Sequence, residues 1–512
     1  MTRRSSAVGT RGMVACDNAL ATAAGIEMLA AGGTAADAVV AADAVLGVVQ
    51  PMSTGLGGDA TCIVALDGSI ESYQGTGAAG AGLDHGPLVD AGVLDPRDPR
   101  LAVVPGVVDA WTHVLGRHGR LGLQRVLQPA IRLAGDGAPV MPVAAAAWAR
   151  FGQELRHDGA RATFLRDGRT PAPFGRFANP ALRTSLERVA AGGPDAFYRG
   201  HIAESIARTI QAAGGVLSVD DLATHRGETG RPISLELDEH VLAEVGPPNG
   251  GLIVLIAVAL VRDIGRGGDE VARVDDSVRA IESAFEVVFG RVGDPRVVAA
   301  VADELLAAEH LDELADRVRN RALAARQDRA GGTVVVTAAD ADGRVVSWAS
   351  SLFQGFGCGV CPAELGFCLN DRGFGFTAEA GHPNAPAPGK RPYHTVMPAL
   401  LTDANGRPVA AFGFAGADMQ PQAQVQLLEH VLAGADPQSA LDAPRWHTAG
   451  GGRLELEDGW PEATFDALAD RGYSVERAAG AVFGRGQLLV VHDEGWYVGA
   501  ADGRGDGLAA GW

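Results

Sequence analysis

Cysteine and aromatic residues are scarce in this chain of 512 residues, which has five cysteines and only 5% Phe, Trp and Tyr. So few cysteines, in an odd number, do not build a disulfide framework, so we expect free thiols. Cys358, Cys361 and Cys368 are close enough in sequence to suggest a metal site, but a second Cys-x-x-Cys pair or a nearby His pair is missing. We therefore expect small buried residues there, with neither metal nor cofactor.

Basic residues are in the minority, with 43 Lys and Arg against 62 Asp and Glu and a net charge of −19. Nucleic acids and anionic membranes both require a basic surface, which argues against either as a partner. Long apolar runs are also missing, because Asp17, Glu27, Asp37 and Asp43 interrupt the alanine-rich stretch near the N-terminus. Residues 17–50 thus predict an amphipathic helix pair rather than a signal peptide or membrane span, and we expect a cytoplasmic protein.

Helical spacing dominates residues 17–50 and 100–330, including a stretch from 297 to 325. Short β-rich runs fill residues 333–512, together with two expected helices at 420–432 and 461–470. Residues 321–332 are charged and end in glycine, which is typical of an exposed linker. Periodicity alone therefore predicts an α/β protein, and the length suits two closely packed halves.

Thr333 follows Gly331 and Gly332 directly and opens the apolar run 334–336. Its hydroxyl could attack the preceding carbonyl, because Gly332 has no side chain to obstruct a strained backbone. Breakage of the Gly332–Thr333 bond would leave Thr333 with a free amine, whose reference pKa of about 8 suits a general base. Nucleophile and base would then come from a single residue.

The residues after Thr333 form two apolar segments separated by Asp340-Ala341-Asp342-Gly343, which predicts a β-hairpin. The second segment brings Ser351 back to the level of Thr333. This block resembles the start of the small subunit of the γ-glutamyltransferase family, whose members are N-terminal nucleophile hydrolases that cleave themselves before a catalytic threonine.

The resemblance covers nearly the whole chain, and its segments follow one another in the family's order. They are residues 11–59 with the Gly-rich turn 53–59, then 104–106, 179–200, 214–225, 247–250, 369–370, 389–398, 413–426 and 499–512. It implies a four-layer αββα sandwich of the N-terminal nucleophile hydrolase type. It also implies a large subunit, 1–332, and a small subunit, 333–512, that stay together as a heterodimer, with a further dimer of these left open.

The resemblance also assigns roles near the nucleophile. The family's Gly-Gly oxyanion pair aligns with Gly416 and Ala417. Alanine keeps the backbone N–H and adds only a methyl group, so the oxyanion hole can survive if φ stays negative at Ala417. Ser351 falls where the family has a hydroxyl that bonds the amine of the catalytic threonine. Without Thr333, Gly416 would be interpreted as part of an ordinary tight turn before a helix, and Ser351 as an ordinary strand serine.

Expected substrate contacts depart from typical members, which bind the γ-glutamyl carboxylate with an arginine and its amino group with an aspartate. Here the arginine is replaced by Gln74 and the aspartate by Gly375, while His394 and Thr395 replace a serine pair. A neutral glutamine cannot form the bidentate, charge-assisted clamp on a carboxylate. We therefore do not expect glutathione as the substrate.

The remaining pattern resembles the family branch that contains oxamate amidohydrolases and related acylases. There, Arg372 and His394 would bind a short anionic or keto group of a small-molecule substrate, although each could instead have a structural role. An amide hydrolase, a C–C hydrolase that removes an oxalyl group in 4-alkylproline-type metabolism, a γ-glutamyl transferase and a non-catalytic binding protein remain as alternatives. Retention of Thr333, Ser351 and Gly416 argues against the last.

Overall fold

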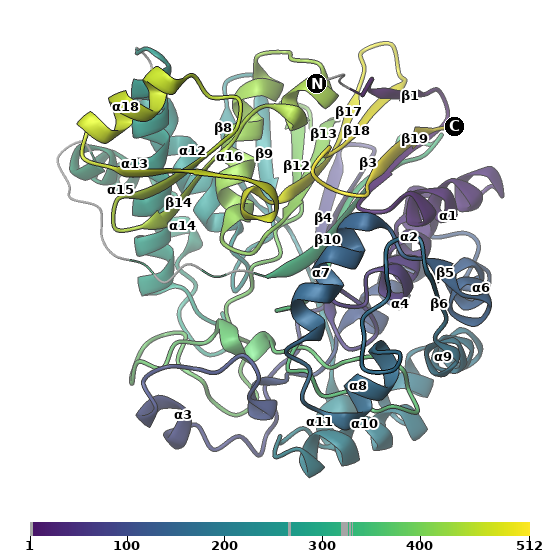
Figure 1. The fold of residues 1–512 in the computed structure, drawn as a ribbon. Coiled ribbons are helices and arrows are strands. Elements are labelled where there is room, and N and C mark those ends of the chain that lie inside the picture. The colour runs from purple at the N-terminus through teal and green to yellow at the C-terminus, as the bar shows by residue number, and fades with distance from the viewer. Residues whose placement is uncertain (1–3, 265–267, 319–325, 327–328, 330) are drawn as a thin grey trace.

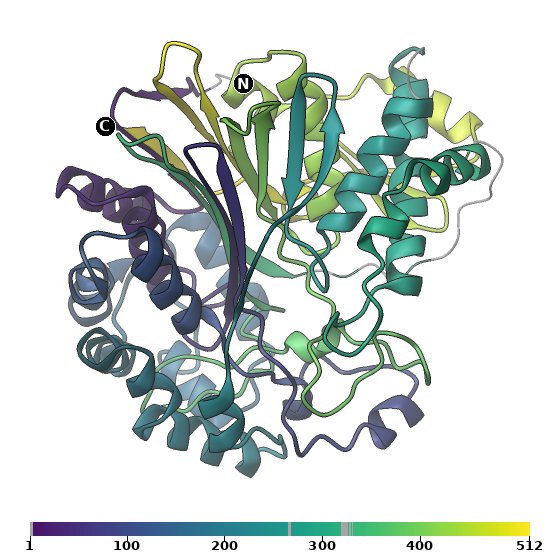
Figure 2. The same cartoon turned by 180° about the vertical axis from the view of Figure 1, so that it is seen from behind.

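The computed structural model describes residues 4–264, 268–318, 326, 329 and 331–512. Two seven-stranded sheets stack face to face, and helices cover the outer face of each (Figure 1 and Figure 2). All strand pairs within both large sheets are antiparallel. This arrangement is the expected four-layer αββα sandwich.

The first sheet has the order β19 (Leu508–Gly511), β2 (Met13–Cys16), β10 (Gly332–Ala339), β11 (Val345–Phe353), β3 (Asp59–Leu66), β4 (Ser69–Gln74) and β7 (Glu228–Gly230). The second has the order β1 (Ala7–Gly9), β18 (Tyr497–Ala501), β17 (Arg485–Val491), β13 (Pro408–Ala415), β12 (Ala399–Asp403), β9 (His240–Glu244) and β8 (Ile233–Leu237). Both sheets thus contain strands from either side of the Gly332–Thr333 bond. Fragments cut there would share two sheets and remain interlocked.

Helices α1 (Ala19–Ala30) and α2 (Ala35–Val49) cover the first sheet and bury the outward face of β10 and β11 in one apolar cluster. On the second sheet, α12 (Gly251–Ile264), α13 (Glu270–Arg291) and α16 (Met419–Leu432) pack with residues of β12 and β13. A separate apolar cluster, which includes Ile63, Leu400 and Leu489, joins the inner faces of the two sheets. These clusters fix β10 as an inner strand, buried on both faces.

The remaining elements surround this sandwich. The helices around the first half are α3 (Gly86–Asp90), α4 (Val107–His118), α5 (Leu123–Val126), α6 (Gln128–Asp136), α7 (Pro142–Gly152), α8 (Asp158–Phe164), α9 (Pro180–Tyr198), α10 (His201–Ala212) and α11 (Val219–Thr224). A small sheet of β14 (Trp446–Gly450), β15 (Arg453–Glu457) and β16 (Ser474–Ala478) lies beside α13, with α17 (Pro437–Asp442) and α18 (Glu462–Asp470). The five cysteines are buried, so they are part of the packing.

The predicted helix pair within 17–50 and the helices at 420–432 and 461–470 are present, with ends shifted by a residue or two. The prediction of helix from 297 to 325 is wrong in part, since the described residues form two short helices, α14 (Ala302–Leu305) and α15 (Ala308–Val318). Residues 297 and 298 form a single turn, in which both N–H groups donate to the backbone carbonyl of Asp294. Most of the expected linker 321–332 lies outside the described residues.

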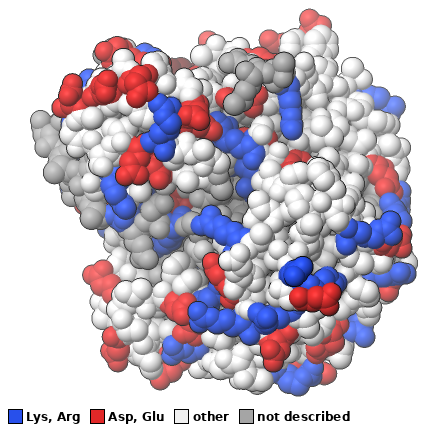
Figure 3. All heavy atoms as spheres, in the orientation of Figure 1, with Lys and Arg blue, Asp and Glu red and all other residues white. Residues whose placement is uncertain are grey.

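Across the described residues, every helix is too short or too polar to cross a bilayer. On the face drawn in Figure 3, Lys and Arg side chains are interspersed with Asp and Glu side chains, and no broad basic area appears on it.

Candidate active site

Thr333 is the second residue of β10 and is 1% exposed. Alternation along the strand places its side chain on the same face as Val335, which packs on Ala349 and Val396 between the two sheets. Ser351 lies on the matching face of β11. The first sheet therefore directs the candidate nucleophile and Ser351 towards the second sheet, in a site closed to bulk water.

A β-bulge lies at the expected cleavage point. The pairing of β10 with β11 changes from Gly332 opposite Phe353 to Val334 opposite Ser350, so β11 contributes one extra residue there. Phe353 adopts a positive φ of 81°. The Ser351 hydroxyl donates a hydrogen bond of 2.6 Å to the Gly332 carbonyl and accepts one of 2.7 Å from the Phe353 N–H. In the uncut chain, Ser351 thus contacts the carbonyl that self-cleavage would attack.

Both glycines before Thr333 lie in close packing, which is tighter at Gly331 than at Gly332. A Cβ at Gly332 would lie 3.2 Å from the Cα of Ser53, in the Gly-rich turn. A Cβ at Gly331 would lie 2.9 Å from the carbonyl oxygen of Phe353 and 3.1 Å from the Cβ of Ala417. Larger residues would push the segment away from β11 and from the Gly416–Ala417 turn.

The Gly416–Ala417 turn joins β13 to α16, beside the residues that precede Thr333. The condition set for the oxyanion hole, a negative φ at Ala417, is not met: its φ is 48°, and that of Gly416 is 134°. The turn requires this conformation because the carbonyls of both residues accept hydrogen bonds from the first N–H groups of α16. A left-handed alanine costs about 1–2 kcal/mol, so packing must hold Ala417 in place.

Gln420, in the first turn of α16, is a site residue that the sequence alone did not identify. Its side-chain amide donates a hydrogen bond of 3.2 Å to the Thr333 hydroxyl, and both side chains are buried. The bond occupies one acceptor site of the hydroxyl oxygen and helps to fix the rotamer of Thr333. The sequence did contain a clue to Gln420, which comes one helical turn after Gly416. The clue is weak, because the same helix contains several other glutamines.

Arg372 and His394 meet at Asp59, and all three side chains are completely buried. The Arg372 guanidinium donates two hydrogen bonds to the Asp59 carboxylate, at 3.1 and 3.2 Å. His394 Nδ1 accepts from the Val396 N–H at 3.0 Å, so the proton is on Nε2, which lies 2.9 Å from Asp59. The sequence grouped Arg372 with His394, but it did not assign their shared partner.

This buried triad has a defined charge state. Burial raises the pKa of Asp59, but Arg372 and His394 outweigh it and hold that pKa below the ordinary value. Burial and the nearby Arg372 lower the pKa of His394, so the imidazole is neutral near pH 7. The third guanidinium nitrogen of Arg372, Nη1, lies 3.4 Å from the Thr395 hydroxyl. In this structure the charge of Arg372 is therefore compensated by Asp59.

Asp59 lies directly opposite Ser351 in the β3–β11 pairing, and the Arg372 guanidinium stacks on the ring of Phe353 at 4.7 Å. The triad is thus next to the bulge that carries Ser351. Gln74 joins the same region, because its amide donates to the Gly246 carbonyl at 3.1 Å and Gly250 of that loop bonds to His394. The predicted substrate residues therefore converge around one end of β11.

Gly375 cannot accept the aspartate of typical members without movement. A Cβ at this position would lie 2.2 Å from the carbonyl oxygen of Tyr393, well inside van der Waals contact. The backbone that carries His394 therefore occupies the space that an acidic side chain would need.

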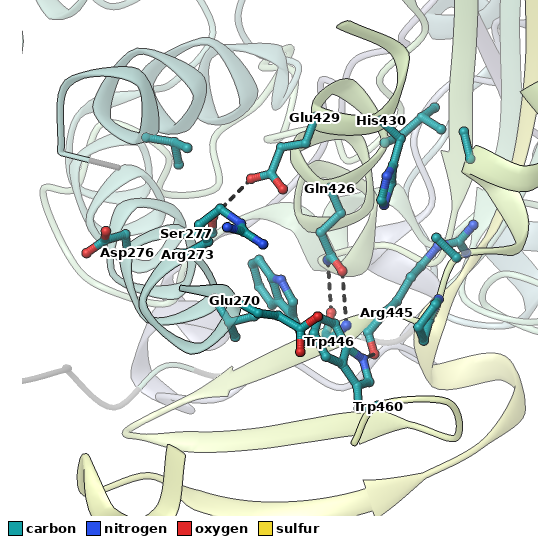
Figure 4. A pocket seen from close by; sticks show the side chains of 16 residues that line it. Glu270, Arg273, Asp276, Ser277, Gln426, Glu429, His430, Arg445, Trp446 and Trp460 are labelled. Atoms are coloured by element: carbon teal, nitrogen blue, oxygen red, sulfur yellow. Dashed lines mark hydrogen bonds between the residues drawn. The ribbon is translucent and has the colours of Figure 1, made fainter. Parts of the chain in front are cut away.

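A cavity of about 510 Å³ lies elsewhere, between α13, the C-terminal half of α16 and β14 (Figure 4). Its lining side chains bond to one another: Gln426 pairs with the backbone of Trp446, and Ser277 donates to Glu429. Figure 4 shows Arg445 and Trp460 on the same side of the cavity as Trp446, away from Ser277 and Glu429. Thr333 is not among the residues that line this cavity.

Comparison with known proteins gives one consistent result. The family model described as gamma-glutamyltranspeptidase matches residues 21–512. The chain is 34% identical to the oxamate amidohydrolase proenzyme of Klebsiella pneumoniae, over 99% of this chain and 100% of that protein. It is 32% identical to the glutathione hydrolase-like YwrD proenzyme of Bacillus subtilis, over 99% of both chains. Its structure superposes on the crystal structure of a cephalosporin acylase from Bacillus halodurans with a TM-score of 0.93 at 32% identity, covering 100% of this chain and 98% of that one. The chain therefore belongs to the gamma-glutamyltranspeptidase family of enzymes.

Proposed function

We propose that this enzyme cleaves itself before Thr333 and then hydrolyses an amide or related acyl bond of a small polar substrate through an acyl-enzyme on Thr333. The observation that carries the proposal is the hydrogen bond of 2.6 Å from Ser351 to the carbonyl of Gly332. It polarises the one carbonyl that the adjacent hydroxyl would attack. The names of two relatives, both proenzymes, support processing as well.

Self-cleavage would proceed in two steps. The Thr333 hydroxyl adds to the Gly332 carbonyl carbon, and Ser351 stabilises the oxyanion. Collapse breaks the C–N bond, transfers the hydroxyl proton to the departing nitrogen and leaves an ester between Gly332 and Thr333. Water then hydrolyses the ester, which releases a Gly332 carboxylate and a Thr333 with a free amine and a free hydroxyl.

In turnover, that free amine takes the hydroxyl proton as Thr333 attacks the substrate carbonyl. Gln420 bonds the hydroxyl. An alanine with positive φ still has its backbone N–H, so we retain the N–H groups of Gly416 and Ala417 as the proposed donors to the new oxyanion. The leaving amine accepts the proton, and water then resolves the acyl-enzyme. For Ser351, we propose that its hydroxyl bonds the Thr333 amine once the Gly332 carbonyl has left.

The residues around the triad favour a substrate other than a γ-glutamyl compound. Gln74 is neutral and engaged with the loop at 246, while position 375 has no room for a carboxylate. Arg372 and His394 are buried against Asp59 next to Ser351, with the Thr395 hydroxyl as a neighbour of Arg372, and would supply the polar groups of the acyl site. Names of relatives, an oxamate amidohydrolase and a cephalosporin acylase, favour hydrolysis of an amide bond.

Two measurements test this function. Intact mass is expected to show fragments 1–332 and 333–512 for the wild type and a single chain for Thr333→Ala. A panel of acyl donors, containing oxamate, glutaryl and γ-glutamyl anilides and an oxalyl C–C substrate, is then compared between the two proteins. An uncut wild type with full activity would refute the mechanism.

A further inference from the structure

Arg326, seven residues before Thr333, places its guanidinium in a specific buried site. One nitrogen donates to the Asp418 carboxylate at 3.0 Å, and another donates to the Thr448 carbonyl at 2.8 Å. Glu282 lies 3.6 Å away, and the ring of Phe285 lies 4.1 Å below the guanidinium plane. Two carboxylates, a carbonyl and an aromatic face together match the donor fork and the flat cation of a guanidinium.

We call these four residues, Glu282, Phe285, Asp418 and Thr448, the cation pocket. Their charged side chains are nearly closed to solvent, with exposures of 7% for Glu282 and 0% for Asp418. The Thr448 hydroxyl donates to Glu282 at 2.8 Å and fixes the orientation of that carboxylate. Glu282 and Phe285 come from α13, in the expected large fragment, whereas Asp418 and Thr448 belong to the small one. The pocket is thus built jointly by both fragments.

The cation pocket is connected to the candidate nucleophile by a short series of contacts. Asp418 directly follows Ala417, and Ala417 lies 3.1 Å from the position of a Cβ on Gly331. The same Asp418 carboxylate accepts the Arg329 N–H at 3.1 Å. Arg329 also stacks its guanidinium on Phe289, at 4.9 Å, and lines an adjoining cavity of about 340 Å³. Cationic groups of the chain thus occupy the region beside the Gly416–Ala417 turn.

The occupation of the cation pocket by Arg326 bears on how a substrate would bind after self-cleavage. Gly331 and Gly332 are on the acyl side of the bond that Thr333 would break, so they occupy the place of an acyl donor. A true substrate must bring its carbonyl to the same hydroxyl, which requires Gly332 to withdraw. Withdrawal of the segment would remove the cation from two buried carboxylates, which is unfavourable unless another cation replaces it.

We propose that the cation pocket is a subsite for a guanidinium or alkylammonium group on the acyl part of the substrate, filled by Arg326 before cleavage. This assignment rests on the proposed hydrolase function and specifies its substrate class. The pocket selects cationic acyl groups over neutral groups of equal shape. It also couples their binding to the Gly416–Ala417 turn through Asp418.

The first experiment tests the pocket without any substrate, by chemical rescue of self-cleavage. Arg326→Ala is expected to slow processing at least tenfold, and added methylguanidinium is expected to restore it with saturation, whereas methylurea is not. Arg326→Lys keeps the cation and is expected to process faster than the alanine variant. Arg291→Ala is the matched control. It removes an exposed ion pair between Arg291, at the C-terminal end of α13, and Glu304. Wild-type processing by Arg326→Ala, or equal rescue by methylurea, would overturn the pocket's cation specificity.

The second experiment uses the processed wild-type enzyme and two anilides of equal shape, 4-guanidinobutanoyl and 4-ureidobutanoyl. We expect kcat/KM to be at least tenfold higher for the guanidino compound, and Glu282→Gln to reduce that preference. Equal rates, or hydrolysis of oxamate with neither anilide cleaved, would refute the subsite and leave the hydrolase function intact. Failure on every acyl donor would instead refute the proposed function, and the rescue of processing would still decide the pocket.

Discussion

Replacement of Ser351 by alanine is the most informative change to the proposed maturation step. The hydroxyl donates its hydrogen bond of 2.6 Å to the Gly332 carbonyl, whose oxygen would carry the negative charge in the transition state of self-cleavage. Loss of one such donor in other enzymes costs about 2.7–4 kcal/mol, or about 10²–10³ in rate. We expect Ser351→Ala to slow processing by that factor, because Ser351 is completely buried and water cannot replace its hydroxyl.

The assay follows the intact chain and its fragments by denaturing gel and mass spectrometry after rapid purification. Ser347→Ala is the matched control, since Ser347 lies four residues earlier on the same face of β11, is equally buried, and donates to the Phe412 carbonyl at 2.8 Å. It removes one hydrogen bond of the same kind without touching Gly332. Ser351→Thr keeps the hydroxyl and is expected to process within about tenfold of the wild type.

Thermal unfolding separates a chemical effect from a structural one. Ser351→Ala leaves the Phe353 N–H without its acceptor, which is expected to cost about 1–3 kcal/mol of stability. Ser347→Ala is expected to destabilise by a comparable amount. Equal processing rates for Ser351→Ala and Ser347→Ala would refute the role of Ser351, because the hydrogen bond to the Gly332 carbonyl would then have no effect on self-cleavage.

Three further predictions follow from the site. Gln420→Leu is expected to lower kcat about 5–15-fold, because it removes a hydrogen bond to Thr333 worth about 1–1.5 kcal/mol. The control Gln424→Leu, one turn further along α16, is expected to leave kcat within about twofold of the wild type, and equal kcat values for the two variants would contradict the role of Gln420. Burial raises the pKa of Asp371 to about 7, so the folded protein holds an extra proton from about pH 4 to 7. Stability should fall as pH rises through this window, by on the order of 1–4 kcal/mol from Asp371, and Asp371→Asn should make the slope in unfolding titrations shallower by that amount; an unchanged slope would contradict this. γ-Glutamyl anilides should react two to three decades more slowly than the true substrate, because Gln74 and Gly375 cannot form charged contacts worth about 2–5 kcal/mol; equal kcat/KM values would contradict this.

The sequence was sufficient for features that depend on neighbouring residues or on their order along the chain. Gly331, Gly332 and Thr333 identified the expected cleavage point, because small residues before a hydroxyl are a local requirement of the chemistry. Helical spacing located α16 and α18, since a 3.6-residue period records which face is buried. The order of the family motifs predicted the four-layer fold, which periodicity alone could not distinguish from other α/β arrangements.

Features that depend on how the sheets stack were decided only by the tertiary structure. The contact of Gln420 with Thr333 and the joint hold of Arg372 and His394 on Asp59 join residues that are 87 and more than 300 positions apart. The register shift that turns Ser351 towards Gly332 and the positive φ of Ala417 also depend on surrounding packing. Local sequence cannot encode such features, because the energy of each buried hydrogen bond or ion pair depends on whichever distant group the fold brings to it.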